Sequence, residues 1–540
     1  MGVLRLTLAT SSKNCTFDGI TPSKKLTWCP CDNGFFCAKL DVPLDYQNPT
    51  LGRASVPLVK LPAKANSSDG PYQGQILLNP GGPGASGISE ALSTGTLIQS
   101  VLGSHWDVVG FDTRGMWLSQ PVANCSSGNS PRVRSVPRVS DDFYTSVIDF
   151  GNQLGQQCQK TIGGRKDIGP HMSTATNARD MLSITNAFAE TEDGKRASKP
   201  SHLLNYYGIS YGTFLGQTFA SMFPGSVGNM VLDGVVSPEG YLANFTSASV
   251  YHLDGVIASF FIYCNKAGPS TCSYYTGSTP KDIYNRFKRA LVQLDPREAE
   301  AKHWSNATDL ETALLTLKIV LLTYADSPLS YFSTMPSVFQ SLETAISSKN
   351  ISSWTQQMTT IFGDPTIASY EAQNPQWSLG TMCSDQYNAL YKKTLRDLRP
   401  LLKDLEQESI IGEIWSHAEL GCTGWSIKAS EIFHGPFGGH TATPIMFVDN
   451  TYDPVTPIEN GISSTPNYKN AQRLTIDAMG HTSIATENLC GFAKLRAYFQ
   501  ANILPGNDSF CALEAGPFGV VLNGTLEENI QMAGLADLVH

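Results

Sequence analysis

The stretch that decides the fold is NYYGISYGT, residues 205–213. Its first three residues end an apolar, strand-like run, and a helix-like pattern follows at residues 211–222. Gly208 and Gly212 stand two positions before and two after Ser210, in the pattern G-x-S-x-G. Small residues are needed there because the chain must turn sharply from strand to helix. We therefore predict that Ser210 sits on this turn, above the edge of a sheet.

Working outward, apolar runs bounded by turn residues recur on both sides of this stretch. They are continuous rather than alternating, which is typical of strands covered on both faces in a parallel sheet. Helical patterns lie between them, so we expect an α/β fold with a mostly parallel, eight-stranded sheet. The strand-like runs are residues 54–60, 75–78, 106–112, 202–207, 227–233, 443–448 and 473–476.

The hydrophobic pattern of the sequence changes at about residue 241. From there until about residue 430, long amphipathic patterns replace the strand-like runs. This favours an inserted helical module within the α/β core. We expect an N-terminal extension with the first strands at 1–50, the first part of the core at 51–240, the helical insertion at 241–430, the second part of the core at 431–505 and a tail at 506–540.

Charge and hydropathy exclude several classes of partner. The 540 residues carry 38 Lys and Arg against 47 Asp and Glu, a net charge of −9. This is the wrong sign for a protein that neutralises phosphates, so nucleic acid and anionic membrane are poor partners. The most apolar stretches, 256–264 and 313–325, are far shorter than the roughly 20 residues that cross a bilayer. We expect a soluble protein.

Cysteine usage indicates an oxidising compartment. The twelve cysteines include no C-x-x-C, so disulfides are a better interpretation than a zinc or redox site. Eight N-x-S/T sequons agree with a secreted glycoprotein. The sequons lie at Asn14, Asn66, Asn124, Asn244, Asn306, Asn350, Asn507 and Asn523.

The beginning of the chain does not fit a complete secretion signal. Residues 4–9 are its only apolar fragment, and Arg5 interrupts it, whereas a signal peptide needs roughly 7–15 apolar residues. We expect that the leader is missing or truncated in this sequence.

A histidine and an aspartate in the second part of the core complete a catalytic pattern with Ser210. His481 follows the strand-like run 473–476, so it would project from the same sheet edge as the serine and is the expected base. Asp453 follows the run 443–448 and would orient the histidine. Asp449 is its nearby rival, but a position at the strand end favours a core or capping role. The order Ser, Asp, His is that of an α/β-hydrolase.

The loop at residues 79–84, NPGGPG, offers amide donors for the oxyanion of a tetrahedral intermediate. We expect the N–H groups of Gly82 and Tyr211 to be the donors, although the choice between Gly81 and Gly82 stays open at this point.

The same loop matches a dinucleotide-binding pattern, because Gly82, Gly84 and Gly87 follow a strand and Asp112 ends a later one. We disfavour this alternative, because Pro83 removes an amide that should face the pyrophosphate and because the pattern leaves the other three residues without a role. No metal or cofactor is expected.

Together these motifs resemble the secreted tripeptidyl-aminopeptidase and prolyl-aminopeptidase-like branch of the α/β-hydrolase serine peptidases. The resemblance covers most of residues 27–505 and is far more specific than the serine motif alone. It is carried by LDVPLDY at 40–46, NPGGPG at 79–84, DTRG at 112–115, NYYGISYGT at 205–213, VLDGV at 231–235, MCSD at 382–385, CTGW at 422–425, DPVTP at 453–457 and Gly480-His481.

This resemblance implies release of short peptides or single residues from a free N-terminus, with the helical insertion as a lid. A lid acid would then hold the substrate ammonium. Asp385 and Glu239 are the candidates, and a cap at the start of a helix over 384–405 is an equally good interpretation of Asp385. Trp117 stands where the family usually has glycine, and we expect its indole to reshape the pocket floor.

The resemblance also implies four disulfides. They join Cys125 to Cys158, Cys264 to Cys272, Cys383 to Cys422 and Cys490 to Cys511, while the pairing of Cys15, Cys29, Cys31 and Cys37 stays open.

Two alternatives remain for the activity. One is an esterase or lactonase on a small hydrophobic substrate, since this fold hosts such reactions. The other is a catalytically silent binding protein, which predicts the loss of a triad member, and none is lost. The peptide or acyl substrate is the only partner expected, and the sequence leaves the oligomeric state open.

Overall fold

The structure is a computed structural model that describes residues 15–64, 70–125, 141–243, 247–296, 299, 304, 307–362, 374–507, 509–514 and 516–536. Its centre is a ten-stranded sheet in the order β1-β2-β3-β5-β4-β6-β7-β8-β9-β10. The strands are β1 (Cys29–Pro30), β2 (Phe36–Pro43), β3 (Arg53–Leu61), β4 (Gly74–Asn79), β5 (Trp106–Phe111), β6 (Leu204–Ile209), β7 (Val227–Asp233), β8 (Met446–Tyr452), β9 (Gln472–Met479) and β10 (Ser509–Cys511).

The sheet is mostly parallel, as expected, because every pair from β5 through β10 runs parallel and only β1, β2 and β3 are antiparallel to their neighbours. The count of ten exceeds the expected eight. Strands β1 and β10, at the two edges, have two and three residues. Runs this short carry no hydrophobic periodicity, so the sequence pattern could not reveal them.

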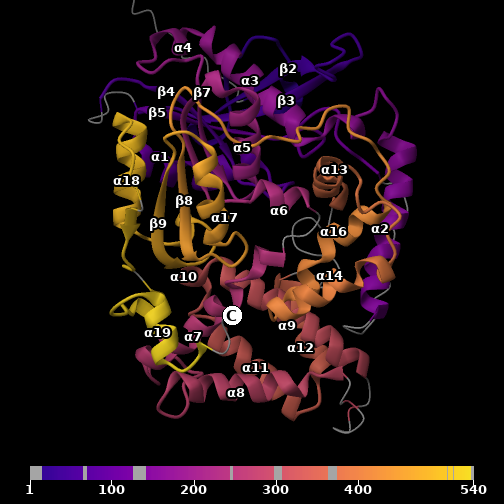
Figure 1. Ribbon diagram of the computed structural model, residues 1–540, viewed down its shortest axis with the longest axis vertical. Coiled ribbons are helices and arrows are strands. Elements are labelled where there is room, and N and C mark those ends of the chain that lie inside the picture. Colours follow the sequence, from indigo (N-terminus) through magenta and orange to yellow (C-terminus); the bar gives the residue numbers. More distant parts are fainter. Residues whose placement is uncertain are drawn as a thin grey trace, which may run out of the picture.

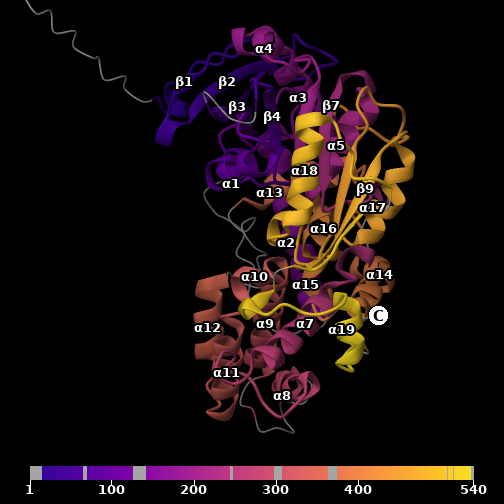
Figure 2. The same ribbon diagram turned by 90° about the vertical axis from the view of Figure 1, so that its left-hand side faces the viewer.

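Helices cover both faces of the sheet, which explains the continuous apolar strands (Figure 2). In β4, Ile76 and Leu78 face the core shared with α1 and α18, whereas Leu77 faces the opposite core. The helices of the core are α1 (Gly87–Leu102), α3 (Thr174–Ala189), α4 (Glu192–Arg196), α5 (Tyr211–Met222), α17 (Ile458–Ser464) and α18 (Leu489–Ala501).

The described residues between β7 and β8 form helices joined by turns and loops, and they include no strand. In the view of Figure 1, helices α7 to α12 gather below the sheet, α14 and α16 lie above α12, and α13 lies at the side of the sheet. The helices of this region, called the lid from here on, are α6 (Pro238–Leu242), α7 (Leu253–Ala267), α8 (Pro280–Gln293), α9 (Ala307–Asp326), α10 (Pro328–Tyr331), α11 (Met335–Ser347), α12 (Ile351–Phe362), α13 (Pro375–Asp385), α14 (Leu395–Glu408), α15 (Gly412–Trp415) and α16 (His417–Gly421).

Helix α2 (Asp141–Ile162) precedes the lid in sequence but packs against it (Figure 1). Its glycines permit the close approach: a Cβ on Gly151 would lie 2.6 Å from Gly421 O, and one on Gly155 would lie 2.0 Å from Gly424 O. The lid therefore rests on a helix that the sequence pattern assigns to the first part of the core.

The expected single helix over residues 384–405 is wrong. Helix α13 ends at Asp385, and α14 begins at Leu395 with a capping box of Thr394 and Asp397. Between them, Tyr387 and Asn388 have φ angles of 59° and 55°, a left-handed conformation that a helix cannot contain. Asp385 thus closes one helix and does not cap the start of another.

The C-terminal tail is built into the fold. Strand β10 pairs with β9, and helix α19 (Leu526–Met532) packs on lid helix α7 (Figure 1). The main-chain N–H of Leu526 donates to Asp477 Oδ2 at 3.3 Å, beside the core strand β9. Residues 506–536 therefore join the core to the lid in their described part.

All twelve cysteines form disulfides. The four pairs that the resemblance implies are present, and the two N-terminal pairs left open are Cys15 with Cys29 and Cys31 with Cys37. Disulfides of this number are typical of oxidising compartments. Within the described ranges, no helix has both the length and the apolar character that spanning a membrane requires.

Four of the eight predicted glycosylation sites fall on described residues, and each of these asparagines is exposed. They are Asn124, Asn350, Asn507 and Asn523, whereas Asn14, Asn66, Asn244 and Asn306 lie outside the described residues.

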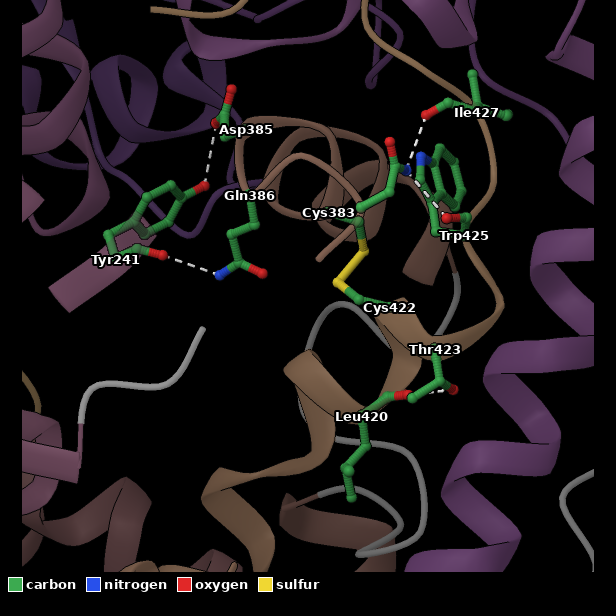
Figure 3. Close-up of a disulfide and its surroundings, with 10 residues drawn as sticks. Tyr241, Cys383, Asp385, Gln386, Leu420, Cys422, Thr423, Trp425 and Ile427 are labelled. Carbon is green, nitrogen blue, oxygen red and sulfur yellow. Dashed lines mark hydrogen bonds between the residues drawn. A yellow bond between two sulfur atoms is a disulfide. The ribbon is translucent and has the colours of Figure 1, made fainter. Parts of the chain in front are cut away.

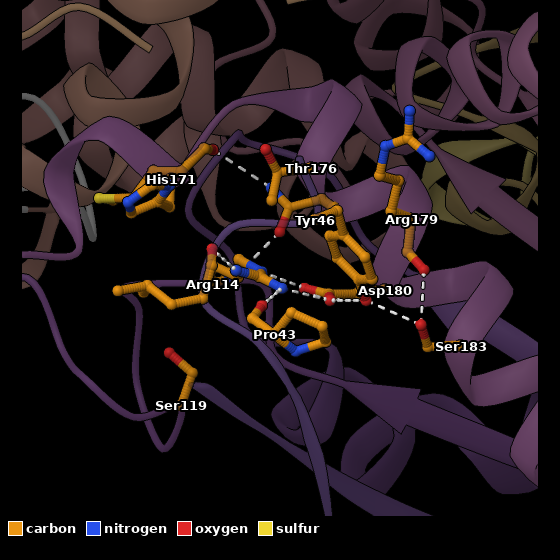
Figure 4. A network of polar contacts seen from close by, with 12 residues as sticks. Pro43, Tyr46, Arg114, Ser119, His171, Thr176, Arg179, Asp180 and Ser183 are labelled. Carbon is orange, nitrogen blue, oxygen red and sulfur yellow. Dashed lines mark hydrogen bonds and ion pairs between the residues drawn. The ribbon is translucent and has the colours of Figure 1, made fainter. Parts of the chain in front are cut away.

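A buried ion pair joins two of the motifs quoted above (Figure 4). Arg114 forms a two-bond pair with Asp180, with Nε to Oδ2 at 2.5 Å and Nη2 to Oδ1 at 2.7 Å. The guanidinium also donates to the carbonyls of Leu44 and Pro43 at 2.6 and 2.7 Å, and Tyr46 donates to Asp180 at 2.7 Å. Charge-assisted bonds of this geometry are among the strongest in proteins, so they fix the loop after β5 to β2 and α3.

Candidate active site

Ser210 stands at the turn between β6 and α5, as predicted. Its backbone has φ 56° and ψ −127°, a strained conformation for a residue with a side chain. The turn is tight: a Cβ on Gly208 would lie 2.5 Å from Gly212 O, and one on Gly212 would lie 2.5 Å from Asn79 O. Ser210 N donates to Asp233 O at 3.0 Å, which ties the turn to the end of β7. This is the geometry of a nucleophile elbow.

Asp453 and His481 lie in contact although 28 residues separate them. His481 Nδ1 is 3.0 Å from both carboxylate oxygens of Asp453, and Thr456 Oγ1 is 3.3 Å from the same nitrogen. Asp453 also accepts the main-chain N–H of Thr456 at 2.8 Å and of Thr482 at 2.9 Å. These amides fix the carboxylate, which in turn holds the orientation of the imidazole.

Burial and charge act in opposite directions on this pair. Burial would lower the pKa of His481, but the charge and hydrogen bond of Asp453 outweigh it and raise the pKa above its usual 6.5, with smaller contributions from Asp326 and Asp233. Burial would likewise raise the pKa of Asp453, yet His481 and the amides around it hold that pKa below its usual 3.8. The carboxylate therefore stays ionised and favours an imidazolium.

Ser210 and His481 line the same cavity, which brings the third predicted residue to the pair. Among the described residues no hydrogen bond joins Ser210 Oγ to the imidazole. Hydrogen bonds of this kind are often long in the absence of substrate and shorten when it binds. The Asp453–His481 contact of the expected triad is thus assembled, and Ser210 lines the same cavity.

The structure distinguishes the two glycines of the oxyanion loop. Gly81 N–H already donates to Asn79 Oδ1 at 3.1 Å, whereas Gly82 lines the cavity. A Cβ on Gly81 would lie 2.8 Å from Tyr211 N, so this loop lies directly against the start of α5. Tyr211 is the first residue of that helix, where N–H groups lack an intrahelical acceptor. Gly82 and Tyr211 line the cavity together with Ser210, and their role as oxyanion donors stays a prediction.

The cavity has a volume of about 680 Å³, within the range of small-molecule and cofactor sites. Residues of the core form one wall, and lid helices α9, α13, α15 and α16 form the other. Three carboxylates line it, those of Glu90, Asp326 and Glu419, and its described lining includes no lysine or arginine. Apart from His481, the cavity therefore presents only negative charge.

Comparison with known proteins agrees with this geometry. Residues 75–252 match the family model described as alpha/beta hydrolase fold, and residues 408–511 match the model described as TAP-like protein. The two matches span the serine turn and the Asp453–His481 pair, respectively. The chain is a TAP-like α/β-hydrolase. It is an enzyme, a serine hydrolase.

Several curated relatives are similar over most of their length. Serine protease Hip1 of Mycobacterium tuberculosis (strain H37Rv) is 25% identical over 512 residues, covering 90% of each chain. Tripeptidyl aminopeptidase of Streptomyces lividans is 23% identical, covering 89% of this chain and 84% of its own. Carboxylesterase B of Mycobacterium tuberculosis (strain CDC 1551) is 26% identical, covering 88% of this chain and 86% of its own.

Among solved structures, a meta-cleavage product hydrolase from Pseudomonas fluorescens is 11% identical, with a TM-score of 0.31, covering 83% of this chain and 94% of its own.

Asp385 of the TAP-like hydrolase is not part of the cavity lining, and its carboxylate lies beside the hydroxyl of Tyr241 (Figure 3). Its carboxylate accepts from Thr174 N at 2.9 Å, Thr174 Oγ1 at 2.5 Å and Tyr241 OH at 3.2 Å. Thr174 Oγ1 is also 2.5 Å from the hydroxyl of Tyr211. Burial raises the pKa of Asp385 to about 7, against these hydrogen bonds. The residue supports two tyrosines of the cavity wall and does not face the substrate space.

The other two candidate substrate residues also lie outside the cavity lining. Glu239 is in the first turn of α6 and is exposed. Trp117 is 40% exposed, donates from Nε1 to Gly84 O at 2.7 Å and packs against Trp377 with its ring tilted by 54°. Its indole therefore braces the outer side of the oxyanion loop, and the expected place on the pocket floor is wrong.

Asp449, the rival of Asp453, is buried at the strand β8 and points away from the pair. A Cβ on Gly461 would lie 1.9 Å from its Oδ2, and its Oδ1 accepts from Val235 N at 3.4 Å. Burial raises its pKa well above 3.8, which disfavours its ionised form.

The surroundings of the loop at residues 79–84 do not fit a dinucleotide-binding site. Ser378 of the lid donates to Pro83 O, and a Cβ on Gly84 would lie 2.6 Å from Ser378 Oγ. Lid atoms therefore occupy the space in front of α1 where a pyrophosphate would bind. The described residues hold no group of three His, Cys, Asp or Glu side chains placed for a metal ion.

Three supporting residues were missed by the sequence interpretation. Asn450 donates to Gly480 O at 2.8 Å and Thr482 O at 2.7 Å, on either side of His481. Asp233 accepts from Ser483 N at 2.9 Å just after it. Asp326 O accepts from His481 N at 2.8 Å. Their spacing along the chain carries no signal, because each contact joins elements far apart in sequence.

Proposed function

We propose that this hydrolase is an exo-acting aminopeptidase that releases short peptides or single residues from free N-termini through an acyl-enzyme on Ser210. The observation that carries the proposal is the charge of the cavity, which has three carboxylates and no lysine or arginine in its described lining. A substrate ammonium compensates buried carboxylates, whereas an uncharged acyl group does not. The lid covers this space, which favours chain ends over internal segments.

In the proposed first half-reaction, Ser210 Oγ forms a bond to the substrate carbonyl carbon while its proton passes to His481 Nε2. The oxyanion accepts hydrogen bonds from Gly82 N–H and Tyr211 N–H. The carbon–nitrogen bond then breaks, and the leaving amine takes the proton from His481. Asp453 stabilises the imidazolium between these two transfers.

In the second half-reaction, a water oxygen attacks the acyl carbon while His481 accepts one water proton. The bond to Ser210 Oγ breaks, and His481 returns that proton to the serine. The free carboxyl product leaves, and the enzyme regains its starting protonation.

Glu419 is the carboxylate that we assign to the substrate ammonium. It lines the cavity from α16, and its charge acts on Tyr241, which lines the cavity from α6. The sequence analysis named Asp385 and Glu239 as candidates for binding the substrate ammonium, and we now propose Glu419 for this role.

The relatives support a peptidase and also keep a second candidate. Two of them carry the names serine protease and tripeptidyl aminopeptidase, and a third carries the name carboxylesterase. An esterase is favoured by the apolar part of the cavity lining, which includes Ile319, Leu322, Phe362, Met382 and Trp415.

One comparison separates the two candidates. Aminoacyl and tripeptidyl anilides with a free amine are assayed beside the same compounds with a blocked amine and beside simple acyl esters. The aminopeptidase proposal requires that blocking lower kcat/KM by at least about tenfold, the effect of roughly 1.4 kcal/mol of lost binding. Equal turnover of free and blocked substrates, with faster turnover of esters, favours the esterase.

We also propose that the protein is a secreted glycoprotein. Six disulfides and four exposed sequon asparagines support this. Expression through a eukaryotic secretory route followed by endoglycosidase treatment tests it: a mass decrease is expected. Peptide mapping that finds all four asparagines unmodified contradicts the glycosylation.

A further inference from the structure

The lid touches the histidine loop through the end of helix α9. Asp326, the last residue of this helix, accepts the main-chain N–H of His481 at 2.8 Å. Gly480 makes the approach possible: its φ is 106°, and a Cβ there would lie 2.8 Å from Pro328 Cδ and 3.1 Å from Asp326 O. A side chain at position 480 would force the two segments apart, so the histidine loop is shaped to fit against the lid.

The carboxylate of Asp326 belongs to the same contact. It lines the cavity together with His481, and the hydrogen bond from Ser327 Oγ, at 3.2 Å, is the one that the described residues give it. Burial raises its pKa, opposed chiefly by the charge of His481. The carboxylate is therefore partly buried, accepts one hydrogen bond among the described residues and interacts electrostatically with His481.

The charged groups around His481 come from several elements. Asp453 follows β8, Asp233 ends β7, and Asp326 ends α9. Glu90 of α1 and Glu419 of α16 also line the cavity. Asp453 holds Nδ1 directly, and Asp233 accepts from Ser483 and Tyr207, at 2.5 Å in each case. Asp326 is thus the acid that the lid contributes to the environment of the histidine.

We propose that Asp326 is a positioning residue of the catalytic base: its carbonyl fixes the His481 loop against the lid, and its carboxylate stabilises the imidazolium that His481 becomes when it takes the proton of Ser210. This inference rests on the proposed serine mechanism. It makes the lid part of the proton-transfer machinery as well as a cover, because the base has its full electrostatic support only while α9 lies against it.

The test uses Asp326→Asn, which keeps the main-chain carbonyl and the size of the side chain and removes its charge. The acid limb of the kcat/KM profile should move to lower pH by about 0.5 to 1 unit, a fraction of the roughly 1 to 3 units caused by an opposite charge in direct contact. The same shift is expected with a free-amine anilide and with an acyl ester that has no amine. Asp309→Asn, at the other end of α9, removes the same charge far from the cavity and should leave the limb in place.

Two results overturn the proposal. An unmoved limb with both substrates shows that the carboxylate does not support the base. A higher KM for free-amine substrates alone, with an unmoved limb, assigns Asp326 to substrate binding instead.

A measurement without turnover separates this inference from the proposed function. The imidazole of His481 is titrated by NMR in the wild-type protein and in Asp326→Asn, with His481→Gln identifying the signal. A lower imidazole pKa in Asp326→Asn supports the inference even if no tested substrate is hydrolysed, and equal pKa values contradict it even if the enzyme is an active aminopeptidase.

Discussion

Ser210 holds a backbone conformation that few residues with side chains adopt, and its neighbours enforce it. Gly81 shows how little room the turn has, since a Cβ there would lie 2.6 Å from Ile209 O and 2.9 Å from Ser210 Cβ. The serine is therefore positioned by the oxyanion loop as much as by its own strand and helix.

Gly81→Ala should consequently displace the serine turn. Because a shift of about 1 Å in a reacting group can cost roughly 10²-fold in rate, we expect kcat to fall by about that factor on any substrate. Gly225→Ala is the matched control, because nothing lies within 4 Å of a Cβ at that position. Full activity of Gly81→Ala would show that the loop tolerates the methyl group and does not define the turn.

Glu419 is the residue on which the free-amine preference depends. Glu419→Gln keeps the shape of the side chain and removes the charge, so KM for free-amine substrates should rise by at least about tenfold. KM for an uncharged acyl ester should change little. An equal increase for both substrates would mean that Glu419 shapes the cavity wall and does not bind an ammonium group.

At the scale of elements, strand ends position the reactive groups and the lid closes over them. The sequence predicted the serine turn and the Asp453–His481 pair because each lies in a short segment directly after an apolar strand. It could not predict the contact of Asp326 with His481, because no local pattern joins helix α9 to the loop after β9. The helix of Asp385 was predicted wrongly because Tyr387, which begins the left-handed turn after it, is of a type that rarely adopts this conformation.

The buried carboxyl group of Asp385, the last residue of α13, should make the stability of the fold depend on pH. In the folded chain the pKa of Asp385 is raised to about 7, chiefly by burial, from its usual 3.8. The unfolded chain releases this proton near the lower value, so the folded state loses stability as the pH rises from about 4 to about 7. Asp385→Asn cannot ionise and removes this loss.

The melting temperature of Asp385→Asn, relative to wild type, should therefore increase between about pH 4 and about pH 8. Thermal unfolding followed by circular dichroism measures it. A constant difference across this range would mean that Asp385 ionises normally. A KM increase confined to free-amine substrates would restore Asp385 as an ammonium site.

At the scale of the whole molecule, segments far apart in sequence are joined by buried polar contacts and disulfides. The C-terminal segment links β9 to lid helix α7, and α2 packs on the far side of the lid. Hydrophobic periodicity shows which face of a helix or strand is buried, but it does not show which element covers that face. The sequence pattern therefore predicted the fold class and could not predict the arrangement of the lid.

Among these contacts, we expect the Arg114–Asp180 ion pair to contribute most to the unfolding free energy. Both side chains are at most 2% exposed, so Arg114→Ala leaves an unpaired buried carboxylate and should cost about 3–5 kcal/mol of unfolding free energy. Arg53→Ala breaks a pair whose side chains are 41% and 21% exposed, and should cost about 0–1 kcal/mol. Denaturant unfolding compares the two variants. Equal midpoints would contradict the structural role of the buried pair.

The relay of Ser210, His481 and Asp453 is tested most directly by covalent labelling with a serine-reactive organophosphonate, followed by peptide mass mapping. We predict one adduct, on Ser210, that is absent in Ser210→Ala and forms at least about 10³-fold more slowly in His481→Ala, because the hydroxyl then lacks its base. Labelling at a different residue, or labelling of Ser210 at an unchanged rate in His481→Ala, would contradict the mechanism.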